Sequence, residues 1–330
     1  MNPSLFPFSQ YWWFYLLFTG GIVCLLGLDL SLHRKAGPMP IRRAALWTAG
    51  WVALALAFAF ALHLYSLGRF GAETARQVTL EFLAGYVVEE SLSIDNMFVF
   101  ALVFRYLAIP VALQHRVLFY GVLGAIVFRG LFIAGGAMLV RFHWVVVAFG
   151  VFLIYTGIRL VLEKEREIKP DSNPLIRLVR RFVPVTSELH GDRFIVRRDG
   201  RRMFTPLFIA VLALETTDIL FAVDSVPAVF GVTQEPFLVF TSNIFAILGL
   251  RAMYFLLAGA MDRFRLLQYG IAFVLVFVGL KMTILDTLAG GRFPVGISLA
   301  IIAAAIGGTI VLSLVSGSKP TPVEVPGPDR

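Results

Sequence analysis

Residues 79–104 carry the stretch that decides the fold, TLEFLAGYVVEESLSIDNMFVFALVF. A helix of about 20 apolar residues crosses the roughly 30 Å hydrocarbon core of a bilayer, so this stretch is long enough to span a membrane. It nevertheless contains four acidic residues, Glu81, Glu89, Glu90 and Asp95. A charge at the centre of a span costs about 2.5–3.5 kcal/mol on insertion scales, and it persists only where it faces protein, water or an ion. The stretch therefore predicts a membrane helix whose acids face protein, water or an ion.

The composition of the whole chain is that of a membrane protein. Of its 330 residues, 58% are hydrophobic and 15% are charged, and the mean hydropathy is +0.81, which lies outside the range of soluble domains. The net charge of +8 does not indicate nucleic-acid binding, because the basic residues fall between apolar stretches rather than on one polar face. The single cysteine, Cys24, excludes an internal disulfide and a cysteine-based metal site.

Apolar stretches of spanning length recur along the chain and predict an all-α polytopic membrane protein with about nine transmembrane helices. They lie at about 11–31, 43–66, 79–104, 117–139, 144–162, 206–226, 237–258, 268–286 and 294–316. We expect a transmembrane domain over residues 1–316, interrupted by a connection at about 163–205 that could form an amphipathic helix and a hairpin. The proline-rich residues 317–330 predict a disordered tail.

The distribution of Lys and Arg predicts the orientation. Cytoplasmic loops carry the excess of basic residues. If every second connection between spans lies on the same side of the membrane, one side, which includes residues 163–205, holds most of the Lys and Arg residues. The connections on the opposite side hold only Arg69, Arg76, Arg141 and Arg292. We therefore expect a multi-pass protein of the bacterial inner membrane, with its N-terminus outside and its C-terminus in the cytoplasm.

Three short motifs recur at one offset of 122 residues and predict an internal repeat. Arg129-Gly-Leu-Phe matches Arg251-Ala-Met-Tyr-Phe, Arg141-Phe matches Arg263-Phe, and Gly157-Ile-Arg159 matches Gly279-Leu-Lys281. The units, about 79–163 and 206–287, contain three spans each, namely spans 3–5 and 6–8. Because three is odd, the second unit enters the membrane from the opposite side, and such inverted repeats place binding sites at the midplane of transporters.

The second unit also begins with an acidic span, which holds Glu215, Asp218 and Asp224. Glu215 and Asp218 share a helix face because they are three residues apart. The six-residue step from Asp218 to Asp224, like that from Glu89 to Asp95, turns an unbroken helix by about 240°. Either both helices are broken, which we favour because freed carbonyls bind cations, or one acid of each pair faces a neighbouring helix.

The break points expected under the first alternative are polar residues or proline beside the acids, namely Ser93, Asn96, Ser225 and Pro227. Carboxylate, amide and hydroxyl oxygens suit Mn²⁺, Mg²⁺ or Ca²⁺, whereas Zn²⁺ and Cu²⁺ usually recruit His or Cys. The five histidines lie in loops or near span ends, so a zinc site is not indicated.

The competing interpretation makes the acids structural, as ion pairs with four intramembrane bases. These bases are Arg129, Arg159, Arg251 and Lys281. The acids of the two spans outnumber them, so pairing would be incomplete. We expect Arg129 and Arg251 to fix the acidic helices or to balance an empty site. Arg159 and Lys281 lie near span ends, where they can snorkel.

Two motifs are similar to the signatures of the TerC family of bacterial membrane proteins. They are Gly85-Tyr-Val-Val-Glu89-Glu-Ser-Leu-Ser-Ile-Asp95-Asn96 and Glu215-Thr-Thr-Asp218-Ile-Leu-Phe-Ala-Val-Asp224-Ser-Val-Pro-Ala. The stretch from Thr241 to Phe255 resembles the family's seventh span. The resemblance implies the nine-span fold, kinship with LysE-type exporters, manganese export as in Alx-like members and a historical link to tellurium resistance. Glu90 departs from the pattern, because relatives commonly have lysine there.

Residues and resemblance together give the predicted metal ligands Glu89, Asp95, Asn96, Glu215, Asp218 and Asp224. The predicted supporting residues are Glu90, Ser93, Ser225, Asn243, Arg129 and Arg251. We expect a secondary transporter, not an enzyme, that exports Mn²⁺, or alternatively Ca²⁺, and is coupled to protons. No cofactor and no nucleic-acid partner are expected; the partners are the bilayer and the cation.

The alternative function is a non-transporting membrane scaffold in the response to metal, tellurite or envelope stress. Its basic cytoplasmic connection would then dock membrane-protein partners. A tellurite-handling enzyme ranks last, since the sequence offers no redox motif and only one thiol.

Overall fold

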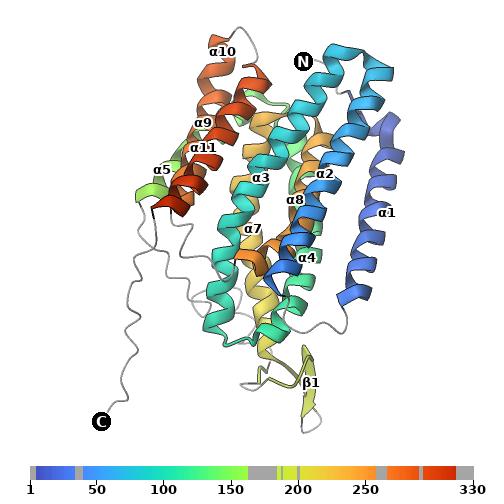
Figure 1. Ribbon diagram of the computed structural model, residues 1–330, viewed down its shortest axis with the longest axis vertical. Coiled ribbons are helices and arrows are strands. Elements are labelled where there is room, and N and C mark those ends of the chain that lie inside the picture. The colour runs from blue at the N-terminus through green and yellow to red at the C-terminus, as the bar shows by residue number, and fades with distance from the viewer. Residues whose placement is uncertain are drawn as a thin grey trace.

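The computed structural model describes residues 5–33, 40–162, 184–186, 189–198, 201–257, 266–289 and 293–316, without the side chains of residues 29–33, 95, 198 and 201. The described part is a bundle of long helices with a small hairpin at one end (Figure 1). The first five helices are α1 (Phe8–His33), α2 (Ile41–Phe70), α3 (Ala72–Tyr106), α4 (Val111–Leu139) and α5 (His143–Leu162). The all-α prediction is confirmed.

The second half of the bundle begins after the hairpin of β1 (Ile195–Arg198) and β2 (Arg201–Phe204), which pair antiparallel. Its helices are α7 (Pro206–Val232), α8 (Pro236–Leu257), α9 (Leu267–Leu280) and α11 (Val295–Val315). A π-helical turn, η3 (Lys281–Leu285), and the short α10 (Asp286–Leu288) extend α9. The predicted hairpin is thus present, whereas the predicted amphipathic helix and the tail at 317–330 lie outside the described residues.

Eight of the described helices are long and apolar enough to cross a membrane, and α3 is the ninth long helix. It has 35 residues and is set apart by the acids in its middle. Large apolar side chains are exposed on the outer helices, among them Leu17, Leu46 and Leu131, as expected for surfaces that face lipid. By contrast, α8 is almost entirely buried and packs against α2, α3 and α4.

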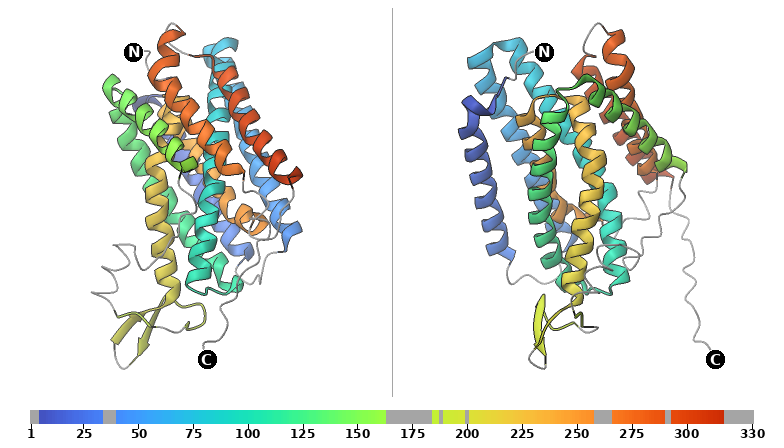
Figure 2. Two further views of the ribbon diagram at one scale, coloured as in Figure 1. Left: turned by 90° about the vertical axis from the view of Figure 1, so that its left-hand side faces the viewer. Right: turned by 180° about the vertical axis from the view of Figure 1, so that it is seen from behind.

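The two acidic helices run in opposite directions. α3 starts at the end of the bundle where the N-terminus lies, and α7 starts beside the hairpin at the other end (Figures 1 and 2). α3 packs on α8, α4 packs on α7, and α5 packs on α9. Exchanging the two predicted units leaves this set of pairs unchanged.

The packing of α5 on α9 repeats the 122-residue offset at atomic detail. A Cβ on Gly157 would lie 2.7 Å from the carbonyl oxygen of Ala272, and a Cβ on Gly279 would lie 2.5 Å from that of Gly150. Each contact becomes the other when 122 is added or subtracted. This agrees with a two-fold relation between the units, and the inverted repeat itself stays a prediction.

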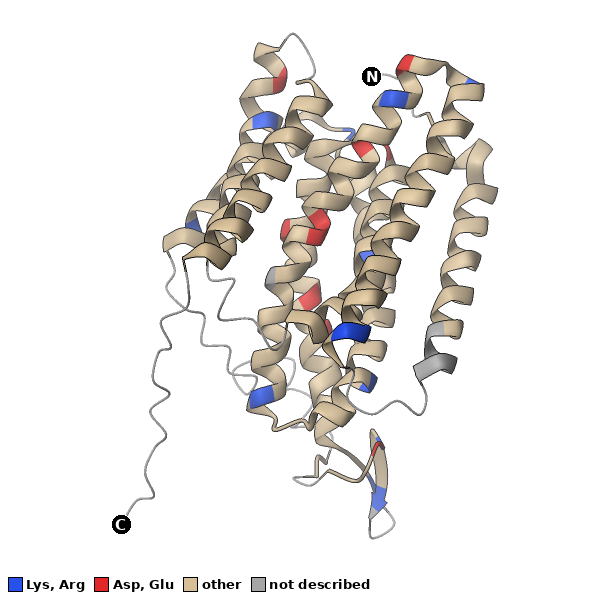
Figure 3. Cartoon of the chain, in the orientation of Figure 1, with Lys and Arg blue, Asp and Glu red and all other residues tan. Residues whose placement is uncertain are grey.

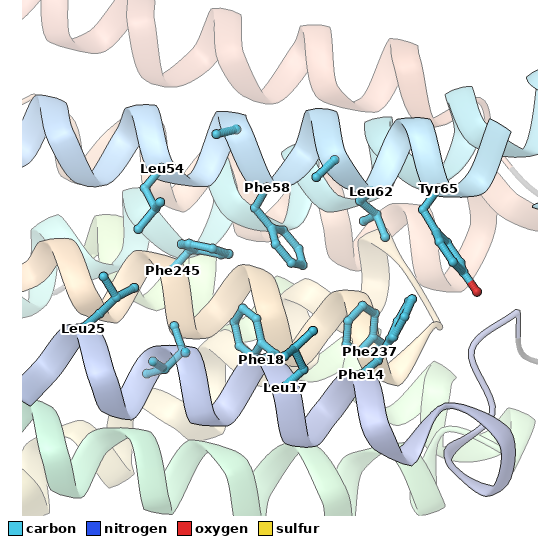
Figure 4. Close-up of a pocket in the computed structure, with 14 residues that line it drawn as sticks. Phe14, Leu17, Phe18, Leu25, Leu54, Phe58, Leu62, Tyr65, Phe237 and Phe245 are labelled. Atoms are coloured by element: carbon cyan, nitrogen blue, oxygen red, sulfur yellow. The ribbon is translucent and has the colours of Figure 1, made fainter. Parts of the chain in front are cut away.

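Helix α1 lies to one side of the bundle and contacts it through aromatic side chains. Phe14 contacts Phe237 of α8 in a tilted arrangement and Phe18 contacts Phe245 edge-on, with ring centroids 5.7 and 5.5 Å apart. An apolar groove of about 470 Å³ lies between α1 and α2, over these rings (Figure 4). Its lining carries no charged side chain, so it is not an ion site.

The expectation that the acidic helices are broken is wrong. α3 and α7 are each helical throughout, and α7 continues through Pro227. Membrane helices tolerate proline because neighbouring groups satisfy the carbonyl that it leaves free. The second alternative therefore applies to α7, and its two aspartates point to different surroundings.

Candidate cation-binding site

Arg129 is the centre of a polar cluster inside the bundle. Its side chain, on α4, is fully buried. Its Nε and Nη2 donate to the two carboxylate oxygens of Asp218, at 3.4 and 3.1 Å. Its Nη1 donates to Ser225 Oγ and to Asn243 Oδ1, both at 3.3 Å, and is in ion-pair contact with Glu89. Three helices, α3, α7 and α8, thus aim oxygen atoms at one guanidinium.

Helical spacing explains which residues of α7 join this cluster. Ser225 follows Asp218 by seven residues, which is about two turns, so both lie on the face towards Arg129. Asp224 is six residues from Asp218 and points elsewhere. It is half-buried and has an interaction partner of its own. The predicted ligands Asp218 and Asp224 are therefore not brought to one point.

Glu215 lies one turn before Asp218 and packs directly on the backbone of α4. A Cβ on Gly124 would overlap its carboxylate, so the glycine makes the space that this carboxylate fills. Glu215 Oε2 is buried, and no described residue donates a hydrogen bond to it. Burying an acceptor without a donor costs free energy. A further cation or a proton beside Glu215 would remove that cost.

Glu90 of α3 is a second carboxylate with one buried oxygen that lacks a donor among the described residues. One of its carboxylate oxygens, Oε1, lies 3.8 Å from where a Cβ on Gly249 of α8 would be. Its other oxygen, Oε2, is buried and lacks a donor in the described part of the chain. Figure 3 shows acidic segments in the interior of the bundle, away from its two ends.

The remaining predicted residues have separate environments. Ser93 and Asn96 are buried, and Ser93 Oγ and Asn96 Nδ2 find no partner among the described residues. The side chain of Asp95 lies outside the described set. Arg251 is buried and has an interaction partner, so its predicted supporting role stays a prediction.

The described space beside Asp218 is small. The cavity that reaches Asp218 has a volume of only about 10 Å³ and is otherwise lined by apolar side chains and a glycine, which is at most about the space of one water molecule. In the described ranges, no three carboxylate, imidazole or thiol groups are grouped to hold a metal ion. Of the predicted ligands, Glu89 and Asp218 are thus arranged around Arg129 rather than around an open metal position.

A second polar region lies at the far end of α7. Glu81 is buried there and accepts hydrogen bonds from Thr233 Oγ1 at 2.5 Å and from Gln77 Nε2 at 2.8 Å. Lys281 donates to the carbonyl oxygen of Gly231 at 2.6 Å. Both Glu81 and Lys281 line a cavity of about 140 Å³. The expectation that Lys281 snorkels is wrong, because its side chain is buried and bonds a free carbonyl at the end of α7.

Sequence reasoning missed two of these features. Gly124 is one glycine among 29, and nothing in its neighbourhood shows that a carboxylate from α7 will lie on it. The bond between Thr233 and Glu81 joins residues 152 positions apart and has no local signal either. Both depend on how α3 and α4 pack on α7.

Fold and site together define a multi-pass helical membrane protein with a charged interior. Comparison with known proteins agrees. The family model for the integral membrane protein TerC family matches residues 74–320, and the chain belongs to this family. An uncharacterized membrane protein of Myxococcus xanthus, STKORF319, is 47% identical over 300 residues, which are 90% of this chain and 91% of that protein.

Two further relatives bear a functional name. The Alx proteins of Photorhabdus laumondii and Escherichia coli K12 are each 44% identical, over 89% and 85% of this chain and 91% and 88% of their own lengths. Their name describes them as membrane-bound redox modulators. No solved structure matches the chain.

Proposed function

We propose that this protein is a secondary transporter that exports a divalent metal cation, Mn²⁺ before Ca²⁺, through the acidic interior between α3, α4, α7 and α8. The observation that carries the proposal is that four carboxylates, those of Glu89, Glu90, Glu215 and Asp218, have oxygens in the interior, and that Arg129 contacts two of them. The described residues supply no donor to the buried oxygens of Glu89, Glu90 and Glu215. Unbalanced carboxylates inside a membrane protein mark ion pathways and proton relays.

The chemistry of the groups favours a hard cation. The converging groups are carboxylate, amide and hydroxyl oxygens, which suit Mn²⁺, Mg²⁺ and Ca²⁺. No histidine is among the residues that contact Arg129. The choice of Mn²⁺, and the outward direction, come from the resemblance to manganese-exporting relatives within the family.

The orientation belongs to the same proposal. The excess of basic residues around the hairpin supports a cytoplasmic position for that end, with the N-terminus outside and the protein in the inner membrane. The cation would then enter near the hairpin and leave near the cavity beside Glu81. Because the cavity that reaches Asp218 has only about 10 Å³, we expect passage to require the two repeat units to move against each other, as in alternating access. Proton gradients are the proposed driving force.

Flux through purified protein tests the proposal. The full chain, reconstituted in liposomes, should move Mn²⁺ along an imposed pH gradient, and Glu89→Gln or Asp218→Asn should abolish that flux. The matched control is Asp192→Asn, which removes a carboxylate from an exposed pair with Arg116 at the hairpin and should leave flux unchanged. Unaltered flux in both interior variants would refute the site.

The alternative remains a scaffold that moves no ion and acts through its cytoplasmic connection. The hairpin supports this candidate, because it projects from the bundle (Figure 1) and carries Arg197, Arg198, Arg201 and Arg202. The two functions differ in a deletion experiment. Removing residues 168–199 abolishes the scaffold function, whereas neutralising Glu89 or Asp218 leaves it intact. The Alx relatives are named redox modulators, but this chain has one cysteine and therefore forms no disulfide within itself.

A further inference from the structure

The position of the Arg129 guanidinium coincides with the place where a transported cation would need its ligands. Two carboxylates, one amide oxygen and one hydroxyl converge on it, from Glu89, Asp218, Asn243 and Ser225. These are the oxygen donors that Mn²⁺ or Ca²⁺ accepts. An arginine and a divalent cation therefore compete for the same oxygens.

Resting on the proposed transport function, we propose that Arg129 is the resident counter-ion of the transport site. It lies between Glu89 and Asp218 while no metal is bound, and an entering divalent cation displaces it. This also accounts for the absence, among the described residues, of a preassembled group of metal ligands. The ligands surround a guanidinium, and they can close on a metal only after the guanidinium has moved.

The contacts permit such an exchange. The bonds from Arg129 to Asp218, Ser225 and Asn243 measure 3.1–3.4 Å, whereas strong charge-assisted bonds measure about 2.7–2.9 Å. Only the contact with Glu89 is closer. Arg129 thus binds Asp218, Ser225 and Asn243 through long hydrogen bonds. A compact divalent charge would bind these three groups more strongly.

The displaced guanidinium has an acceptor within the same cluster. Glu215 is three residues before Asp218 on α7, about 4.5 Å along the helix axis, and its Oε2 lacks a donor among the described residues. With the metal between Glu89 and Asp218 and Arg129 beside Glu215, two carboxylates balance the divalent ion and the third balances the arginine. The loaded cluster is then electrically neutral.

After the metal has left, the carrier has a defined metal-free state. When the metal leaves, Arg129 returns and keeps Glu89 and Asp218 from facing each other without a cation, which low-dielectric surroundings would penalise. The empty carrier can therefore reset with its site occupied. Arg129 should also weaken metal binding, because the metal must displace it, and a carrier that binds too tightly releases slowly.

Equilibrium binding of Mn²⁺ to the purified full chain tests this inference. Arg129→Gln removes the competitor, so its affinity for Mn²⁺ should exceed that of the wild type by about tenfold or more, while its rate of Mn²⁺ release falls. Arg129→Lys keeps a charge without the two-pronged contact to Asp218 and should have an intermediate affinity. Arg116→Gln, on the same helix but exposed, is the control and should bind as the wild type does.

The outcomes separate this inference from the proposed function. If the wild type neither binds nor moves Mn²⁺, the proposed function fails. If the wild type binds and moves Mn²⁺ but Arg129→Gln binds it equally well or more weakly, Arg129 is a structural cap and the inference is overturned. Should Arg129→Gln fold only with Mn²⁺ present, the metal has replaced the arginine, as expected. Should it not fold at all, the comparison of Arg129→Lys with the wild type decides, and equal or weaker binding by Arg129→Lys overturns the inference.

Discussion

Two pairs of carboxylates in the interior of this bundle, Glu89 with Asp218 and Glu90 with Glu215, lie under different conditions. Glu89 and Asp218 contact Arg129, so their charge is balanced at least in part by the protein itself. Glu90 and Glu215 each bury one oxygen without a hydrogen-bond donor among the described residues, as Glu89 also does, but they form no ion pair in the described part of the chain. The first pair resembles a structural ion pair, and the second has no structural explanation. The difference is the basis for our proposal that the interior accepts a further cation.

Asp218→Asn tests the balanced pair and should have the largest effect. It removes one partner of a buried ion pair, which costs about 3–5 kcal/mol where the remaining charge is left unpaired. Glu89 still pairs with Arg129, so we expect the lower end of this range, together with loss of Mn²⁺ flux. Thermal unfolding in detergent and flux in liposomes measure the two effects. A variant with unchanged stability and unchanged Mn²⁺ flux would contradict the difference that we draw between the two pairs.

Glu215→Gln tests the unbalanced pair and should change stability in the opposite direction. The amide carries no charge, so removing an unsatisfied buried carboxylate should raise the free energy of unfolding by about 1 kcal/mol. Mn²⁺ flux should nevertheless fall by about 10- to 100-fold, as for the loss of a group that tunes a metal site. The same two assays apply, and a destabilised variant would show that Glu215 has a structural partner.

Gly124→Ala tests whether the position of Glu215 matters, with the carboxylate itself left in place. The added methyl group overlaps that carboxylate, so Glu215 must move, and we expect flux to fall by about tenfold. The control is Gly121→Ala on the same helix. Its Cβ would meet only the side chain of Leu214, at 3.5 Å, an ordinary contact. Equal flux in both variants would contradict a role for the position of Glu215.

Glu81→Gln should have the smallest effect. Both carboxylate oxygens of Glu81 accept hydrogen bonds from neutral donors, Gln77 and Thr233, so the residue belongs to neither of the two pairs. We expect a loss of about 1 kcal/mol in stability, as for one hydrogen bond, and nearly unchanged flux. Abolished flux would extend the transport site to this end of α7.

Much of this arrangement could be predicted from the sequence, because it depends on composition and on the cost of charge in lipid. The long helices follow from the apolar stretches, and α3 is identified despite its acids because its length suffices. Glu89, Asp218 and Arg129 stand out as charges inside spans. A hairpin is also expected within the polar connection at about 163–205.

The rest depends on packing between helices, which no local pattern reports. The sequence does not show that Arg129, rather than Arg251, meets Asp218, because that requires the contact of α4 with α7. It does not show that α7 stays helical through Pro227, because neighbouring groups decide that cost. Lys281 is a similar case, since its burial depends on the free carbonyl of Gly231.

The most direct test of the central claim is the equilibrium binding of Mn²⁺ to the purified wild-type chain and to the Glu89→Gln, Asp218→Asn double variant. If the interior holds a divalent cation, the wild type binds Mn²⁺ saturably and the double variant does not, while both remain folded. Equal binding by the two chains, or no saturable binding by the wild type, would contradict the account.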